Sequence, residues 1–473
     1  MRRLVLSVSA VALAATALPG LASGPAAADL VQKPLGVGGF MSENVSYVGT
    51  LPIAPGIGGR VLTVDGQQRL YMTGSQGLYV FDVDDPALPV PLGFYHLPHF
   101  QNEDVDVSDD GKRVIISTDT AGADRNGSTA NGIHVLDTSN LGSIRRVGFI
   151  NQSNHTTTCA DAKCEWLYGS GGRIYDATNP ASIKHVGEWK PAALEDGTRV
   201  SGGHALNRDE SGLMISDTNP RLVLDVTDPA APVVVASGAA SVQLPDGLLQ
   251  HNNVRLGATE WQAREEGDDD PALRPGELFI GNSESNLRTQ CGSNAGGLSS
   301  WSMKDFDKGA PLEQREVFRP VNGSIAEGNP AVNALGCSGH WFTVRDGMIA
   351  ASWYEHGVRF IDVDSEGAFT QKGYFQPVVT EAGAAHWIPG PDGSEYVYSM
   401  DYARGIDILK FDRGGEVPTQ EQFDASWMAN LGSQGVLSIV ERNLCRAAME
   451  GHDAHVAAGS TSPVVATAAV PRT

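Results

Sequence analysis

The feature that most constrains this chain is a strand motif that recurs along it. Most copies consist of a glycine, a run of alternating apolar and polar residues, an aspartate and a short turn rich in Asp, Thr, Asn and Pro. The clear copies are Gly77–Asp82, Gly132–Asp137, Gly172–Asp176, Arg221–Asp225, Gly357–Asp362 and Gly405–Asp412, and a diverged seventh copy surrounds Gly297 and Trp301. The two-residue period is that of a half-buried strand, and the residues that follow it favour tight turns.

Further short strands flank each copy of the motif. Alternating segments such as Gln68–Thr73 precede the copies, and segments such as Val90–Phe94 follow six of them. Four short strands in about 40–50 residues are typical of one blade of a β-propeller. The last copy has no strand after it, but the segment Val45–Thr50 supplies one from the N-terminus. We therefore predict an all-β, seven-bladed β-propeller over residues 44–413, closed by the N-terminal strand so that no sheet edge stays exposed.

The composition agrees with turn-rich β structure. Glycine accounts for 55 of the 473 residues, about 12%, against a usual share of about 7%, and no collagen-like period accompanies it. The repeat, Leu-Tyr-Val-Phe-Asp-Val in its first copy, resembles that of the LVIVD-repeat family of bacterial secreted and surface β-propeller proteins. The resemblance covers residues 44–413 and implies the fold and a secreted or surface location. It implies no activity, because the family has no uniform one.

Both ends of the chain are predicted to lie outside the propeller. Residues 1–28 have a basic start, an apolar run and a final Ala-Ala-Ala, which are typical of a cleaved secretory signal peptide. Cleavage near Ala28 would release a secreted, extracellular bacterial protein in which residues 29–43 form a linker. Residues 414–450 have the apolar spacing of a helical extension, and residues 451–473 have the composition of a disordered tail. We predict no transmembrane segment, because no later run is long and apolar enough to span a membrane.

Charge and cysteine content narrow the partners and the compartment. The chain has 34 basic and 56 acidic residues and a net charge of −22, which argues against a nucleic-acid partner because phosphate binding needs a basic surface. An exported chain meets an oxidising environment. We therefore predict a local disulfide between Cys159 and Cys164 and a second one, between Cys291 and Cys337, across a long insertion. Cys445 then has no assigned role.

One position of the repeat has the most chemical potential. The residue at the start of the innermost strand of successive blades is Arg60, Asp104, His155, His204, His251, His340 and His386. Histidine makes up only 12 of the 473 residues, so five in a column of seven is a large excess. Because the innermost strands of a propeller line its central channel, we expect these side chains to converge at one mouth of the channel.

Several imidazoles without cysteine suit a transition metal better than calcium or magnesium. We predict copper as the favoured ion, with zinc and iron as alternatives, and the metal ligands His155, His204, His251, His340 and His386. Residues that orient a ligand or contact a substrate are predicted to be Arg60, Asp104, Glu284, Glu355, His356, Arg404, Trp341 and Trp387. The arrangement is similar in kind to propellers that hold copper through channel histidines, and it suggests a copper-dependent oxidoreductase acting on a small molecule.

Two alternatives stay open at the level of sequence. The pairs Gly203-His204 and Gly339-His340 resemble the structural Gly-His pairs of WD-type propellers, in which the imidazole holds a loop. On that reading the protein is a non-catalytic scaffold whose face binds a small molecule or an envelope component. A calcium-dependent lactonase-type propeller is disfavoured, because Asp104 is the only carboxylate in the column. The sequence determines neither the substrate nor the oligomeric state.

Overall fold

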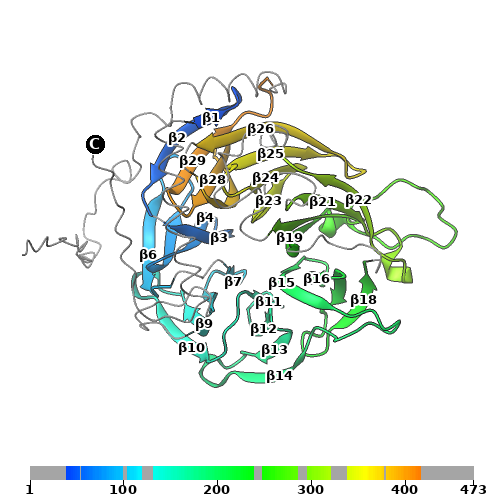
Figure 1. Ribbon diagram of the computed structural model, residues 1–473. Coiled ribbons are helices and arrows are strands. Elements are labelled where there is room, and N and C mark those ends of the chain that lie inside the picture. The colour runs from blue at the N-terminus through cyan, green and yellow to red at the C-terminus, as the bar shows by residue number, and fades with distance from the viewer. Residues whose placement is uncertain are drawn as a thin grey trace, which may run out of the picture.

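The computed structural model describes residues 39–53, 55–99, 104–119, 131–238, 248–285, 296–320, 338–377 and 380–416. Within these residues, seven antiparallel sheets surround a central axis (Figure 1). The chain is therefore a seven-bladed β-propeller, in agreement with the blade count expected from the repeats. The signal peptide, the helical extension, the tail, Cys291, Cys337 and Cys445 lie outside the described residues.

Each of the first five blades consists of four consecutive strands. The strands are β3 (Gly56–Val64), β4 (Gln67–Gly74), β5 (Gly77–Asp82) and β6 (Val90–His96) in blade 1; β7 (Val105–Val107), β8 (Arg113–Thr118), β9 (Gly132–Asp137) and β10 (Arg145–Ile150) in blade 2; β11 (Thr157–Cys159), β12 (Trp166–Gly169), β13 (Arg173–Asp176) and β14 (Lys184–Glu188) in blade 3; β15 (Ser201–Arg208), β16 (Leu213–Asn219), β17 (Leu222–Asp225) and β18 (Val233–Ser237) in blade 4; and β19 (Leu248–Leu256), β20 (Leu278–Ser285), β21 (Leu298–Ser302) and β22 (Glu313–Phe318) in blade 5.

The last two blades combine strands from both ends of the propeller. The strands are β23 (Phe342–Arg345), β24 (Met348–Ser352), β25 (Val358–Val363), β26 (Phe369–Pro377) and β1 (Gly39–Met41) in blade 6, and β27 (Ala382–Pro389), β28 (Glu395–Asp401), β29 (Gly405–Phe411) and β2 (Val45–Leu51) in blade 7. Four short 3-10 helices lie in connecting segments of the described chain: η2 (Leu141–Ser143), η3 (Pro180–Ser182), η4 (Ala258–Glu260) and η5 (Phe306–Lys308).

The N-terminal segment joins the last two blades. β2 pairs antiparallel with β29, with Val45 opposite Phe411 and Leu51 opposite Ile406. β1 pairs with β26, so the last residues of the segment predicted as a linker add a fifth strand to blade 6. Between the two strands, the Ser42 amide donates to the Tyr374 carbonyl oxygen at 3.1 Å. The segment 39–51 therefore contacts both neighbouring blades.

The recurring motif forms the third strand of the blades, and its aspartate holds the turn that follows. Asp82, Asp137, Asp176 and Asp225 each accept a hydrogen bond, at 2.9–3.0 Å, from the backbone amide two residues later. These carboxylates are structural turn residues.

The hydrophobic core lies between neighbouring blades, so the middle strands are buried on both faces. Leu70 and Met72 of blade 1, for example, share a cluster with Ile388, Tyr398 and Ile406 of blade 7. This explains why the strand segments are rich in Val, Ile and Leu. The predicted disulfide between Cys159 and Cys164 is present and buried in such a cluster, between blades 2 and 3. The described part of the chain contains no helix that is long and apolar enough to cross a membrane.

Candidate functional site

Four histidines from consecutive blades lie side by side at one end of the channel. His155 precedes β11, His204 lies in β15, His251 lies in β19, and His340 precedes β23. Successive ring centroids are 4.6, 3.9 and 4.2 Å apart. We call these four residues the histidine row.

The backbone before and beside the row is held by local contacts. Gly203, with φ of +113°, lets the chain turn just before His204, and a side chain there would come within 3.2 Å of the Ser170 carbonyl oxygen. The Thr156 hydroxyl donates to the His204 carbonyl oxygen, and the side-chain amide of Asn282 donates to the His340 carbonyl oxygen. These bonds between neighbouring blades keep the inner strands in a register that brings the imidazoles together.

The Nδ1 atoms at the two ends of the row meet oxygen atoms. His155 Nδ1 lies 2.7 Å from Asp119 Oδ2, and His340 Nδ1 lies 2.6 Å from the Gly383 carbonyl oxygen. A carbonyl oxygen can only accept, so His340 carries its proton on Nδ1, and the carboxylate favours the same tautomer for His155. The lone pair is then on Nε2. This second hydrogen bond to a carboxylate or a carbonyl is typical of histidines that bind metals.

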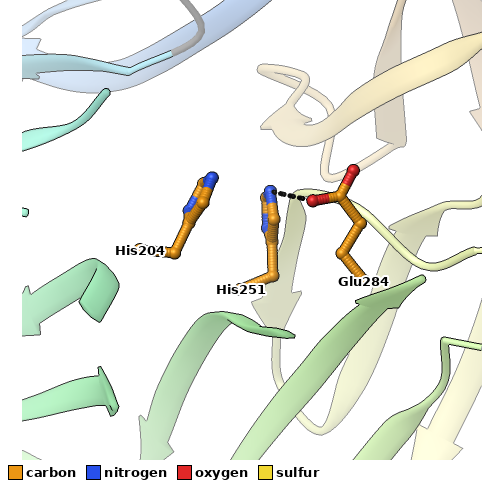
Figure 2. A group of neighbouring side chains, drawn as sticks. All are labelled: His204, His251 and Glu284. Atoms are coloured by element: carbon orange, nitrogen blue, oxygen red, sulfur yellow. Dashed lines mark ion pairs between the residues drawn. The ribbon is translucent and has the colours of Figure 1, made fainter. Parts of the chain in front are cut away.

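Glu284 completes a group of ligand atoms in the centre of the row. One atom each from His204, His251 and Glu284 lie within 4.8 Å of one another. His251 Nε2 is 3.8 Å from Glu284 Oε2, and the Tyr354 hydroxyl donates to Glu284 Oε1 at 2.6 Å. Figure 2 shows the His251 ring between the His204 ring and the Glu284 carboxylate.

The donor set fits a transition metal. Two imidazoles and one carboxylate form a known ligand combination for zinc, and imidazole also suits copper and iron. Ligand atoms around a tetrahedral ion lie about 3.3–3.6 Å apart when the bonds are about 2.0–2.2 Å long. The distance of 3.8 Å between His251 Nε2 and Glu284 Oε2 is close to that spacing. Rotation of the side chains would bring the ligand atom of His204, which lies within 4.8 Å of the other two, to the same spacing. His251 is fully buried and His204 is 9% exposed, so little water competes for their nitrogen atoms.

Aromatic rings and a groove surround the row. The Trp341 ring is 5.0 Å from that of His251, and the Tyr354 ring is 4.8 Å from that of His340. A surface groove of about 550 Å³ opens beside His155, His204 and Glu284. A small molecule could therefore approach the row from solvent.

The other three residues of the predicted column lie in a different place. Arg60, Asp104 and His386 line a cavity of about 420 Å³ farther along the channel. The His340 ring contacts the carbonyl oxygen of Gly383, and His386 is three residues beyond Gly383 in β27, about 10 Å at the rise of a strand. The expected convergence of five histidines therefore holds for four. The residue of blade 7 that lies beside His340 is Gly383, and His386 lies three residues farther along β27.

The remaining predicted residues have varied surroundings. Trp341 lies against the row, whereas Trp387 is buried between blades 6 and 7 and donates from Nε1 to the Met348 carbonyl oxygen at 3.1 Å. Adjacent residues of a strand point to opposite faces, so Trp387 turns away when His386 faces the channel. Arg404 forms an ion pair with Asp407, with Nε 2.6 Å from Oδ2. Glu355 and His356 are buried in the turn between β24 and β25.

Sequence reasoning missed Asp119 and Tyr354. Asp119 directly follows the second strand of blade 2, and Glu284 is the last residue but one of the second strand of blade 5, so an alignment of these strand ends would have found Asp119. The length of the connection from β8 to β9 obscured the equivalence. Tyr354 lies in the loop that supplied Glu355 and His356, but an aromatic residue is not itself a metal ligand.

No protein family and no curated protein matches the chain. Similar solved structures include the β-propeller domain of Cps50 (Swd1) from Myceliophteria thermophila, at 11% identity and a TM-score of 0.49 over 78% of this chain and 100% of that one. Others are a putative 6-phosphogluconolactonase from Bacteroides uniformis (14%, 0.43, 75% and 94%) and a periplasmic gluconolactonase from Pseudomonas aeruginosa (12%, 0.44, 73% and 92%). These likenesses concern the fold and carry no activity to this chain. The fold and the site define a seven-bladed β-propeller with a row of histidines at one end of its channel.

Proposed function

We propose that this protein is an exported β-propeller that binds a transition metal at the histidine row. His204, His251 and Glu284 would be ligands, with His155 and His340 next to them as further donors. The observation that carries the proposal is the group of three ligand atoms within 4.8 Å, on strands from neighbouring blades. The Nδ1 contacts of His155 and His340 support it, because they place the lone pair of each imidazole on Nε2, the tautomer that metal-binding histidines of this kind have.

Copper is the favoured ion, and the proposed activity is that of a copper-dependent oxidoreductase. Copper(II) heads the affinity order of divalent metals for nitrogen and oxygen ligands, and zinc and iron are the alternatives. When bound, the ion would supply redox or Lewis-acid chemistry. The residues of the chain would position a substrate in the groove beside the row, and the Trp341 and Tyr354 rings would limit the access of water.

Metal analysis tests the proposal. Untagged protein is reconstituted separately with copper, zinc and iron(II), dialysed, and measured by elemental analysis. We expect about one ion per chain, lost in the double variant His204→Ala/His251→Ala. The matched control is His185→Ala, which removes a half-exposed histidine of the outer strand β14. No bound metal under any of the three conditions would overturn the proposal. That result would favour the alternative hypothesis, in which the protein is a non-catalytic scaffold that binds a small molecule or an envelope component.

We also propose that the protein is an exported member of the LVIVD-repeat family whose ring is closed by the N-terminal strand. The pairing of β2 with β29 and the position of the repeat in the third strands support the fold-level part. The buried disulfide supports an oxidising compartment. The proposed partners are a small molecule or an envelope component at the channel mouth, and the acidic net charge disfavours nucleic acid.

A further inference from the structure

The central cavity of about 420 Å³ is a second concave site, separate from the groove at the histidine row. Its wall is formed by inner strands from both halves of the ring, including β3, β15, β19, β23 and β27. The size is within the range of small-molecule sites in proteins, which is about 300–1,000 Å³.

Most polar groups in the cavity wall already have partners. Asn207 Nδ2 donates to Asn252 Oδ1 at 2.8 Å, and Thr343 Oγ1 donates to the Ala385 carbonyl oxygen at 2.9 Å. Two backbone amides of β11 donate hydrogen bonds to carboxylates of the wall, that of Thr157 to Asp104 and that of Cys159 to Asp106, both at 2.7 Å. These groups maintain the wall of the channel.

Three nitrogen-bearing groups keep hydrogen-bonding capacity. Within the described residues, His386 Nε2 and Trp341 Nε1 are buried and have no hydrogen-bond partner. His386 as a whole is 8% exposed. The Arg60 Nε atom is 3.9 Å from Asp106 Oδ1, which is too far for a hydrogen bond. Buried polar groups of native proteins are nearly always paired. All three residues line this cavity.

We infer that this cavity binds a small monocarboxylate, held by the Arg60 guanidinium and by the ring nitrogens of Trp341 and His386. The two oxygens of a carboxylate match the two parallel donors of a guanidinium. Burial and the Arg60 charge lower the pKa of His386 to about 4, so at neutral pH its imidazole can donate one hydrogen bond without adding a charge. The nearby carboxylates of Asp104 and Asp106 disfavour a dianion such as phosphate.

Binding is measured by calorimetry on metal-free protein, with acetate, propionate and benzoate as probes. The neutral amides of the same acids and inorganic phosphate are the comparison ligands. We expect saturable binding of at least one carboxylate, with affinity about tenfold or more above that of its amide and above that of phosphate. Equal binding of acid and amide, or binding of phosphate alone, would overturn the inference.

Variants locate the site. Arg60→Gln and Trp341→Phe should each lower carboxylate affinity, Arg60→Gln by about tenfold or more, and His386→Phe should lower it by removing the ring N–H donor. Arg60 is half-exposed, so Arg60→Gln is expected to fold, and circular dichroism checks this. Arg315→Gln, on the outer strand β22, is the matched control and should bind as the wild type does. Because the titrations use metal-free protein, failure of the metal proposal would not affect this result. Unchanged affinity in Arg60→Gln would place the carboxylate elsewhere and refute the inference.

Discussion

The Nδ1 atom of His155 lies 2.7 Å from the Oδ2 atom of Asp119, in a different blade. This contact fixes the orientation of the imidazole at one end of the histidine row, next to the ring of His204. A carboxylate in this position raises the donor strength of a metal-binding histidine through its other nitrogen.

The first prediction concerns this contact. Asp119→Asn should lower the affinity of the row for its metal by about 10–100-fold, if His155 is one of the ligands. A titration against a competing chelator measures the affinity. Asp137→Asn, which changes a turn carboxylate bonded to Ser139, is the control and should bind metal normally. An unchanged affinity in Asp119→Asn would show that His155 is not a ligand.

The second prediction concerns pH. Burial, with the Asp401 charge as a second cause, raises the pKa of Glu381 from its ordinary value of 4.5 to about 7. The folded protein therefore holds a proton that the unfolded chain releases above about pH 4.5. This contribution to stability is complete at lower pH and is lost as the pH rises through 7.

Glu381→Gln should remove this dependence. Relative to the wild type, the free energy of unfolding of the variant should rise by about 2 kcal/mol between pH 5 and pH 8. Denaturant unfolding at the two pH values measures the difference, and Glu316→Gln on the exposed strand β22 is the control. Parallel pH profiles of variant and wild type would contradict the prediction.

The third prediction concerns the buried ion pair of Asp217 and Arg221. Both side chains are fully buried in blade 4, and Arg221 also donates to the Asn282 carbonyl oxygen at 3.0 Å. Arg221→Met would leave a buried carboxylate without its cation, so it should lower the free energy of unfolding by about 3–5 kcal/mol.

Two further variants make that test specific. The double variant Asp217→Asn/Arg221→Met should lose less stability than the sum of the single changes, because it removes both charges. Arg145→Met breaks a surface ion pair in which the arginine side chain is 73% exposed, and it should cost less than about 1 kcal/mol. A small loss in Arg221→Met would mean that Asp217 is protonated in the folded protein.

The fourth prediction concerns the N-terminal strand. A chain that starts at residue 55 lacks β1 and β2, so the edge of β29 and the cluster around Leu51 would be exposed. We expect the shortened chain to aggregate, because an open strand edge pairs with other chains. A chain that starts at residue 39 keeps both strands and is the control. Light scattering after gel filtration measures the mass, and identical behaviour of the two chains would argue against closure by β2.

The blades could be predicted from the sequence because their signals are local. The strand period of Gly77–Asp82 and its turn residues lie within a few positions of one another, and each later copy repeats them. The Cys159–Cys164 disulfide was equally accessible, since five residues separate the cysteines and a turn brings them together. A repeated local pattern is sufficient to specify repeated local structure.

The site was only partly predictable because it depends on contacts between blades. The column of histidines indicated where to look, and its four members from blades 3 to 6 do lie together. His386 fits the same sequence pattern but lines another cavity, because Gly383 is the residue of β27 that lies beside His340. Asp119 comes from a neighbouring blade and completes the row from there. The sequence alone therefore determined the number of blades and the presence of several histidines in the channel. The tertiary structure decided which side chains meet, since strand register and loop paths between blades leave no local pattern.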